Sequence, residues 1–363
     1  MTQFFKNLVD RRSLLSGGIS LLGGTSMLAA SNSSASSTET YTKGMAHKGM
    51  GQMMTVGDVD TSINGFDPTA LLTDWETGSV TTDENGNTVR TFTVEAIDKE
   101  IEIAPGVIFP AWTFNGRVPG PTLRATEGEI LRIIFRNLGS HPHSMHFHGI
   151  HSARMDGVSS NSGLIDPGDE YVYEFNATPF GCHLYHCHAL PFTRHMHKGM
   201  YGAFIIDPDP AKHLDHHAVA KSRKLGTPEN AEWQELVMVM NAFDTNFDGE
   251  NEFYAVNTVA HHYMKHPIPI NRSKPVRVYL INVTEFDPIN SFHLHANFYD
   301  YFDHGTTLTP TLKTVDTIMQ CQAQRGILEF SFKDHQPGKY MFHAHQAEFA
   351  ELGWMAEFDV QEG

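Results

Sequence analysis

The sequence has few cysteines, and no long apolar run follows its first thirty residues. Three cysteines in 363 residues are too few for a disulfide scaffold, and Cys187 lies between two histidines. No later segment approaches the roughly 20 consecutive apolar residues that a membrane span requires. We therefore expect no membrane span, free buried thiols at Cys182 and Cys321, and metal chemistry at Cys187.

Basic residues are also scarce. Lys and Arg number 26 against 42 Asp and Glu, which gives a formal charge of −16. This charge argues against nucleic acid or anionic lipid as the main partner. At 363 residues the chain is long enough for two ordinary domains.

The N-terminal segment has the layout of an export signal over residues 1–35. Lys6, Arg11 and Arg12 precede a moderately apolar run that ends in small residues. The paired arginines resemble a twin-arginine signal, with an ordinary secretory signal as the alternative. Either signal predicts a periplasmic or secreted protein.

The next segment, residues 36–85, is rich in Ser, Thr, Gly and Met with weak periodicity, which predicts a flexible arm. Within it, "MAHKGMGQMM" at 45–54 carries four methionines and a histidine. Thioethers favour Cu(I), so this stretch either feeds or recruits cuprous copper, or it is simply flexible.

From residue 86 onward, short segments rich in β-branched and aromatic residues alternate with Pro, Gly and Asn, which predicts an all-β fold. The pattern occurs twice. "LRIIFRN" is echoed by "VRVYLIN", and "GCHLYHCH" by "GKYMFHAH". We expect one β-domain over 86–210, a linker over 211–232, and a second copy over 233–363.

Paired histidines occupy equivalent places in the two copies. One such pair arises easily by chance among surface or core histidines, but four at matching positions do not. Alternation along a strand points both imidazoles of a pair to one side, and imidazole suits copper, zinc, iron and nickel. The four pairs are His146 with His148, His186 with His188, His293 with His295, and His343 with His345.

Strand parity predicts a second metal site. His143 lies an odd number of positions before His146, so it faces the opposite side, as Cys187 does relative to its flanking histidines. His195 and Met200 follow on the next loop, with His197 as the alternative to His195. A Cys, two His and a weak axial Met make a blue-copper site.

These motifs resemble those of multicopper oxidases, specifically the two-domain, laccase-like type with blue copper in the first domain. The resemblance rests on "HSMHFHG", "HCHALPFTRHMHKGM", "HLH" and "HAH", and it covers about residues 110–358. It implies an all-β chain of two cupredoxin-like Greek-key β-sandwich domains. It also implies about four copper ions per chain.

The resemblance further implies which residues hold copper. His143, Cys187, His195 and Met200 would hold type 1 copper, and His146 and His293 would hold type 2 copper. The type 3 pair would be held by His148, His186, His188, His295, His343 and His345. In the second domain, Asn290 and Ala344 stand where the first has His143 and Cys187, so we expect no type 1 copper there.

The implied activity is one-electron oxidation of phenolic or similar donors, coupled to four-electron reduction of dioxygen to water. Because that reduction consumes protons, we expect a nearby carboxylate. Asp156 in "RMDGV" resembles the family's acidic residue, with Glu348 and Glu351 as weaker candidates. The resemblance also implies a homotrimer with intersubunit copper clusters.

Three alternatives remain. Cu(I) or another low-valent metal ion could be the donor. A copper nitrite reductase also has two cupredoxin domains, although a mononuclear catalytic copper has no use for histidines at both 188 and 345. The abundant His and Met would also suit a copper-binding protein without turnover.

Overall fold

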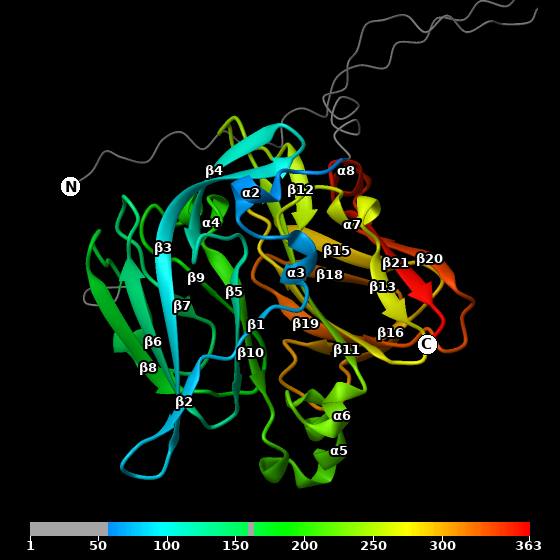
Figure 1. Ribbon diagram of the computed structural model, residues 1–363, viewed down its shortest axis with the longest axis horizontal. Coiled ribbons are helices and arrows are strands. Elements are labelled where there is room, and N and C mark those ends of the chain that lie inside the picture. The colour runs from blue at the N-terminus through cyan, green and yellow to red at the C-terminus, as the bar shows by residue number, and fades with distance from the viewer. Residues whose placement is uncertain (1–56, 159–162) are drawn as a thin grey trace, which may run out of the picture. The chain divides into compact units, whose positions relative to one another are not determined.

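The computed structural model describes residues 57–158 and 163–363 (Figure 1). The predicted export signal and the methionine-rich stretch at 45–54 lie outside these residues. Among the described residues, no helix is long and apolar enough to cross a membrane.

The fold is all-β, as the sequence predicts, with two cupredoxin-like sandwich domains. The strands of the first domain are β1 Trp75–Glu76, β2 Ser79–Thr82, β3 Thr88–Ala104, β4 Val107–Phe114, β5 Gly120–Thr126, β6 Ile130–Asn137, β7 His146–Phe147, β8 Glu170–Asn176, β9 Gly181–His186 and β10 Tyr201–Asp207. Those of the second domain are β11 Gln234–Phe243, β12 Phe253–Val256, β13 Ile268–Asn271, β14 Val276–Asn282, β15 Ile289–Leu294, β16 Tyr299–Asp303, β17 Leu312–Val315, β18 Thr317–Cys321, β19 Arg325–Phe330, β20 Gly338–His343 and β21 Met355–Gln361.

The first domain packs a sheet of order β1-β5-β10-β9-β7 against one of order β2-β3-β6-β8, with β4 paired to β3. Buried and exposed residues alternate along β6 and β8, so the second of these sheets turns one apolar face inward. Phe92, Leu123, Tyr173 and Phe204 are among the buried side chains between the two sheets.

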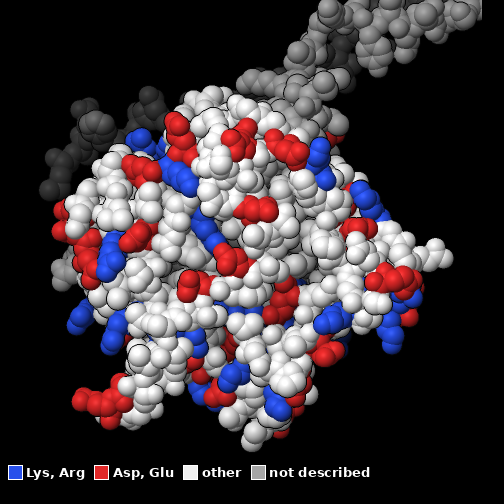
Figure 2. All heavy atoms as spheres, in the orientation of Figure 1, with Lys and Arg blue, Asp and Glu red and all other residues white. Residues whose placement is uncertain are grey.

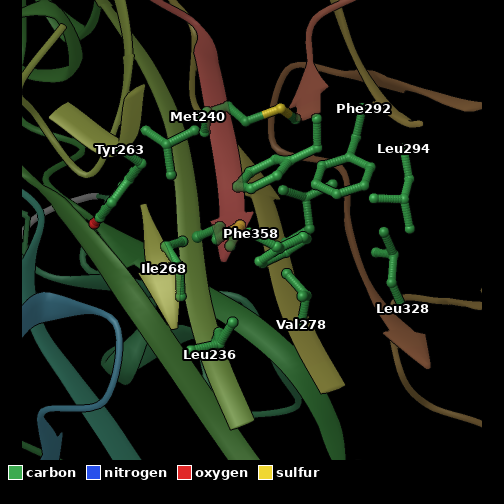
Figure 3. Close-up of a cluster of buried hydrophobic side chains, with 14 of the residues drawn as sticks. Leu236, Met240, Tyr263, Ile268, Val278, Phe292, Leu294, Leu328 and Phe358 are labelled. Carbon is green, nitrogen blue, oxygen red and sulfur yellow. The ribbon is translucent and has the colours of Figure 1, made fainter. Parts of the chain in front are cut away.

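The second domain repeats this plan. A sheet of order β12-β11-β14-β19-β16-β17 packs against one of order β13-β21-β20-β15-β18. Strand β14 pairs in parallel with β11 and antiparallel with β19, just as β6 pairs with β3 and β8. Figure 3 shows the core between its sheets, including Phe292, Leu294 and Phe358. The internal repeat therefore corresponds to a duplicated domain.

The two domains share a third apolar layer, because several strands are buried on both faces. In β11, Leu236 and Met238 enter the core of the second domain, whereas Val237 and Val239 pack against the first. Strands β9 and β10 are buried along their whole length. The four sheets therefore stack face to face within one compact unit.

The described part of the predicted arm is ordered, so the prediction of flexibility is wrong for residues 57–85. It forms helices α2 Thr61–Asn64 and α3 Pro68–Leu71 before β1 and β2. Asp60 and Asp67 cap the two helices. Leu72 enters the core of the second domain, and β1 pairs with β5. These distant contacts hold a segment that has little periodicity of its own.

The stretch that the sequence predicts as a linker contains short helices. Residues 210–231 contain the 3₁₀ turns η3 Pro210–Lys212 and η4 Leu214–His216 and the helices α5 His217–Arg223 and α6 Pro228–Ala231. Arg223 at the end of α5 is buried and pairs with Glu329 of β19. Elsewhere, acidic and basic side chains are interspersed over the face shown in Figure 2.

Candidate metal centres

Three of the four predicted blue-copper residues converge on one buried point. His195 Nδ1 lies 3.1 Å from Cys187 Sγ, and His143 Nδ1 lies 3.9 Å from it. The two imidazole Nδ1 atoms are 3.2 Å apart. His143, Cys187, His195 and Met200 are all buried. The fold thus brings a thiol and two imidazoles to distances that suit a single ion.

Local backbone contacts hold this set in place. Cys187 follows the end of β9, and its N–H donates to the carbonyl of Met200 at 3.0 Å. Ser144 N–H donates to Cys187 Sγ at 3.3 Å. His195 lies on helix α4 Phe192–His197, not on the expected loop, and the Met200 N–H donates to its carbonyl at 3.2 Å.

His197, the alternative ligand, points elsewhere. Its Nε2 accepts the Asp244 N–H at 3.1 Å, and its ring packs against Phe109 and Phe247. The geometry therefore selects His195 for the set.

The donor set fits copper. Burial lowers the pKa of His143 to about 3 and that of His195 to about 4, so both rings are neutral and present lone pairs. His143 Nε2 has no hydrogen-bond partner. Burial raises the pKa of the Cys187 thiol to about 11, a cost that a bound cation would offset. The thiol and the two imidazoles, with Met200 buried in the same cluster as Cys187, are the residue types that suit blue copper.

The histidines of the first domain form a second set on the other face of the same strands. His146 lies on β7, His186 ends β9, and His148 and His188 each follow two residues later. The Nε2 atoms of His148 and His186 are 3.1 Å apart. The ring centroid of His146 lies 5.1 Å from that of His148 and 5.5 Å from that of His188. The predicted separation into a cysteine set and a histidine set is thus present in the structure, although His143 lies in an isolated bridge before β7 rather than on that strand.

Carbonyl oxygens orient two of these rings. His146 Nδ1 donates to the carbonyl of Asp156 at 2.7 Å, and His186 Nδ1 donates to the carbonyl of Cys187 at 3.1 Å. In both rings Nδ1 is therefore held by a carbonyl oxygen, which leaves Nε2 as the atom available to a metal, the usual arrangement of a metal-binding histidine. The Asp156 carboxylate lies 3.3 Å from His146 Nδ1, and its side chain is 39% exposed.

The second domain supplies a matching set on β15 and β20. The Nε2 atoms of His295 and His343 are 2.9 Å apart. His293 lies 4.9 Å from His295 and 5.2 Å from His345, measured between ring centroids. His343 Nδ1 donates to the carbonyl of Ala344 at 2.6 Å, as His186 does to Cys187.

The two histidine sets do not meet within the chain. Over residues 57–158 and 163–363, no hydrogen bond or ring contact joins a histidine of one set to a histidine of the other. His186 is buried, whereas His295 and His345 are exposed. The two sets are therefore separate within the described residues, and each is called a half-site.

The second domain retains the framework of the blue-copper site without its ligands. The Ala344 N–H donates to the carbonyl of Trp354 at 3.2 Å, as Cys187 does to Met200. The Trp354 N–H donates to the carbonyl of Phe349 at 2.8 Å, as Met200 does to His195. With Asn290 in the place of His143, this position offers no thiolate and no imidazole.

The remaining sequence candidates differ in their positions. Asp156 contacts His146, whereas Glu348 on α8 Ala347–Glu351 and the neighbouring Glu351 make no contact with a histidine of the two sets in the described chain. The expectation of two buried free thiols is correct for Cys182 but wrong for Cys321, which is exposed. Cys321 ends an edge strand, so only one of its sides is covered.

Two residues near the first-domain set escaped sequence reasoning. His151 Nε2 lies 4.0 Å from the Asp156 carboxylate, and Arg325 donates to His148 Nδ1 at 3.4 Å from the start of β19. His151 follows closely on the "HFH" motif, a weak signal. Arg325 comes from the other domain, and no local pattern could have indicated it.

Comparison with known proteins identifies the family to which this architecture belongs. The fold and the two kinds of donor set define a cupredoxin-type copper protein of two domains. Residues 96–211 and 230–363 each match a multicopper oxidase family description. The chain belongs to the multicopper oxidase family, and that membership implies copper binding.

Individual relatives point to more than one activity. A crystal structure described as a multicopper oxidase is 49% identical, with a TM-score of 0.75, and the alignment covers 84% of this chain and 100% of that one. A probable nitrite reductase-hydroxylamine oxidoreductase fusion protein from Kuenenia stuttgartiensis is 27% identical over 74% of this chain and 31% of its own length. Copper resistance protein A from Escherichia coli is 39% identical over 31% of this chain and 19% of its own length. The chain thus spans less than a third of either curated relative.

Proposed function

We propose that this chain is a laccase-like oxidase that couples one-electron oxidation of phenolic or similar donors to four-electron reduction of dioxygen. The observation that carries the proposal is the pair of matched four-histidine half-sites, together with a Cys187 set directly behind the first. A single catalytic metal would not need eight histidines. Such an arrangement suits several ions acting together.

When bound, copper would supply one-electron redox chemistry at the Cys187 set and oxygen reduction at the histidines. The chain supplies the connection, because His186 and His188 are the covalent neighbours of Cys187. Their rings point to one face of β9 and its extension, and the Cys187 side chain points to the other. The shortest path between the two kinds of site is therefore backbone.

Asp156 is the residue that we assign to proton delivery. Its carbonyl fixes His146, and its partly exposed carboxylate lies between that ring and solvent. His151, which donates from Nε2 to the carbonyl of Phe147 at 2.8 Å, lies 4.0 Å from the same carboxylate and also contacts the His146 ring. A carboxylate in this position can carry protons to the histidine half-site.

The separate half-sites support an assembly in which subunits complete each other. We propose a head-to-tail homotrimer in which the first domain of one chain faces the second domain of its neighbour. Exposed apolar side chains accompany both half-sites. Ile150 and Leu190 are 65% and 79% exposed near the first, and Phe298 and Met319 are 53% and 63% exposed near the second. Large exposed apolar residues are typical of interaction surfaces.

The export signal predicted from residues 1–35 supports a location in the periplasm or outside the cell. A donor would then reach the protein from that compartment. No sequence motif identifies the electron donor, so the donor is determined by experiment. Oxygen uptake by the copper-loaded protein is measured with substituted phenols, Cu(I), Fe(II) and Mn(II). Oxidation of phenols is the expected result, and uptake confined to a metal ion would overturn the laccase-like assignment.

Nitrite reduction is the second candidate, because the Kuenenia stuttgartiensis relative is described as a nitrite reductase fusion. The same copper-loaded protein is supplied with a reduced donor and nitrite without oxygen. No consumption of nitrite is expected. Nitrite turnover faster than oxygen turnover would favour the reductase.

A further inference from the structure

The exposed face of the β13-β21-β20-β15-β18 sheet carries more metal-binding groups than the histidines. Its opposite face forms the core in Figure 3, where Phe292, Leu294 and Phe358 are buried. Because side chains alternate along a strand, the residues between these point outward. Three outward positions to which the proposed oxidase assigns no copper ligand are occupied by methionine.

Two methionines lie on the β20 and β21 side of the histidines. Met355 pairs directly with His343 across the two strands. Met341 is two residues before His343, so it lies on the same face, and its carbonyl accepts the His295 N–H at 3.0 Å. Directly opposed residues in antiparallel strands have Cβ atoms about 4.5–5.5 Å apart. Each thioether can therefore reach the neighbouring imidazole.

The third methionine lies on the β18 side. Met319 pairs with Ser291, and the Ser291 hydroxyl accepts the His345 N–H at 2.7 Å. Its side chain therefore borders the opposite edge of the same half-site. Cys321 is two residues further along and is also exposed. Soft sulfur atoms thus flank the histidine half-site on both sides.

These methionines are also unusually accessible. Met319 is 63% exposed, whereas Met238 and Met240 in the core of the same domain are fully buried. Met341 and Met355 are partly exposed. An apolar side chain that served only to fill the core would not lie on this face.

We propose that Met319, Met341 and Met355 form, with the second-domain histidines of the unassembled chain, an acquisition site for Cu(I). Thioether sulfur selects Cu(I), whereas imidazole also accepts Cu(II) and Zn(II). A cuprous ion held at this rim is one side chain away from the histidines that the oxidase proposal assigns to the cluster. The binding step changes no oxidation state and does not depend on oxygen reduction.

A second explanation is that the methionines are adaptable packing residues at a subunit contact. The two explanations predict different losses. A substitution that removes the sulfur but keeps the apolar volume should weaken Cu(I) binding if the methionines are ligands. It should leave Cu(I) binding unchanged if they are packing residues. Leucine is the appropriate replacement, because it preserves size and hydrophobicity without a sulfur ligand.

The test uses the metal-free full chain with Cys187→Ser, so that the buried thiolate does not dominate cuprous binding. Met319→Leu, Met341→Leu and Met355→Leu are added singly and together, and Met264→Leu on helix α7 His262–Lys265 serves as the matched control. Cu(I) affinity is measured without oxygen by competition with bicinchoninate. Zn(II) affinity and the melting temperature are measured on the same samples.

The triple variant is expected to lose Cu(I) affinity by about tenfold or more, the scale of ligand-sphere changes, with unchanged Zn(II) affinity. The Met264→Leu variant should match its parent. Unchanged Cu(I) affinity in the triple variant, or an equal loss of Zn(II) affinity, would overturn the proposal. Either result would leave the oxidase proposal standing, because that proposal is tested by oxygen uptake.

Discussion

At the scale of single residues, Cys187 has the most specific role, because only a thiolate gives blue copper its charge-transfer colour. We expect Cys187→Ser to abolish the intense blue absorption and donor oxidation, because a hydroxyl cannot supply that covalent charge transfer. The histidine half-sites should still bind copper. Visible absorption and copper content are measured together.

Cys182→Ala provides the control for this variant. Cys182 is also a buried thiol of β9, and burial raises its pKa to about 12. Among the described residues, its side chain contacts neither the Cys187 set nor the histidines of the two half-sites. It should keep the blue band. A blue band that survived Cys187→Ser would show that the copper ligands lie elsewhere.

Asp156 permits a second residue-scale prediction. Asp156→Asn keeps the carbonyl that fixes His146 and removes the carboxylate that exchanges protons. We expect oxygen consumption to fall about 100-fold, within the range for loss of a general acid, with copper content unchanged. Glu348→Gln should have little effect, because Glu348 contacts no histidine of either set. If the two variants behaved in the opposite way, proton delivery would belong to Glu348.

At the scale of elements, the turn that follows η2 Ala153–Met155 holds Asp156 against β7. Gly157 has a φ of +68°, and an added Cβ would lie 2.0 Å from the carbonyl oxygen of Met145. We expect Gly157→Ala to lower the melting temperature and the copper content, because it displaces the turn that orients His146. Gly168→Ala is the matched control.

Gly168 has a similar φ of +91°, but nothing lies within 4 Å of its added Cβ. The loss of stability in Gly168→Ala therefore measures only the backbone strain of a left-handed residue, about 1 kcal/mol or more. Equal losses in the two variants would mean that steric contact with β7 is not what places the turn.

The helices and strands also show which parts of the fold could be predicted from the sequence. The duplicated domain and the separation of Cys187 from His186 and His188 follow from local alternation, and the structure has both. The helices at 61–71 could not be predicted, because they depend on distant partners. The hydroxyl of Tyr263 donates to the carbonyl of Pro68, and Val237 N–H donates to the carbonyl of Leu72.

The surroundings of the metal sites also could not be predicted from local sequence patterns. Helix α4 carries His195 in a segment with too few residues to show helical periodicity. Arg325 reaches His148 across the domain boundary, and the exposure of His295 depends on which face of the β13-β21-β20-β15-β18 sheet is left uncovered. Such features arise from tertiary packing rather than from spacing along the chain.

At the scale of the whole molecule, a buried ion network joins the two domains. Glu235 of β11 accepts from Arg124 at 2.8 Å and from Arg277 at 2.9 Å. Burial opposes its ionisation, but the two arginines outweigh that cost and lower its pKa to about 2. We expect Glu235→Gln to lower the free energy of unfolding by about 3–5 kcal/mol, as for a broken buried pair.

The sign of the pH dependence follows from that pKa. Because the pKa lies below its ordinary value of 4.5, the stabilisation is present above pH 4.5 and is lost as the pH falls towards 2. The difference between wild type and Glu235→Gln should shrink over that window in denaturant titrations. Glu174→Gln, in an exposed pair with Arg132, should cost under about 1 kcal/mol. An equal cost for both would contradict a special role for the buried network.

The central claim is that the oxygen site combines the first-domain half-site of one chain with the second-domain half-site of another. The most direct measurement mixes two inactive chains, one with His186→Ala and His188→Ala, the other with His343→Ala and His345→Ala. In mixed oligomers, the intact first domain of the second chain can face the intact second domain of the first. Recovery of oxygen consumption in verified mixed oligomers is the predicted result, and no recovery would contradict the account.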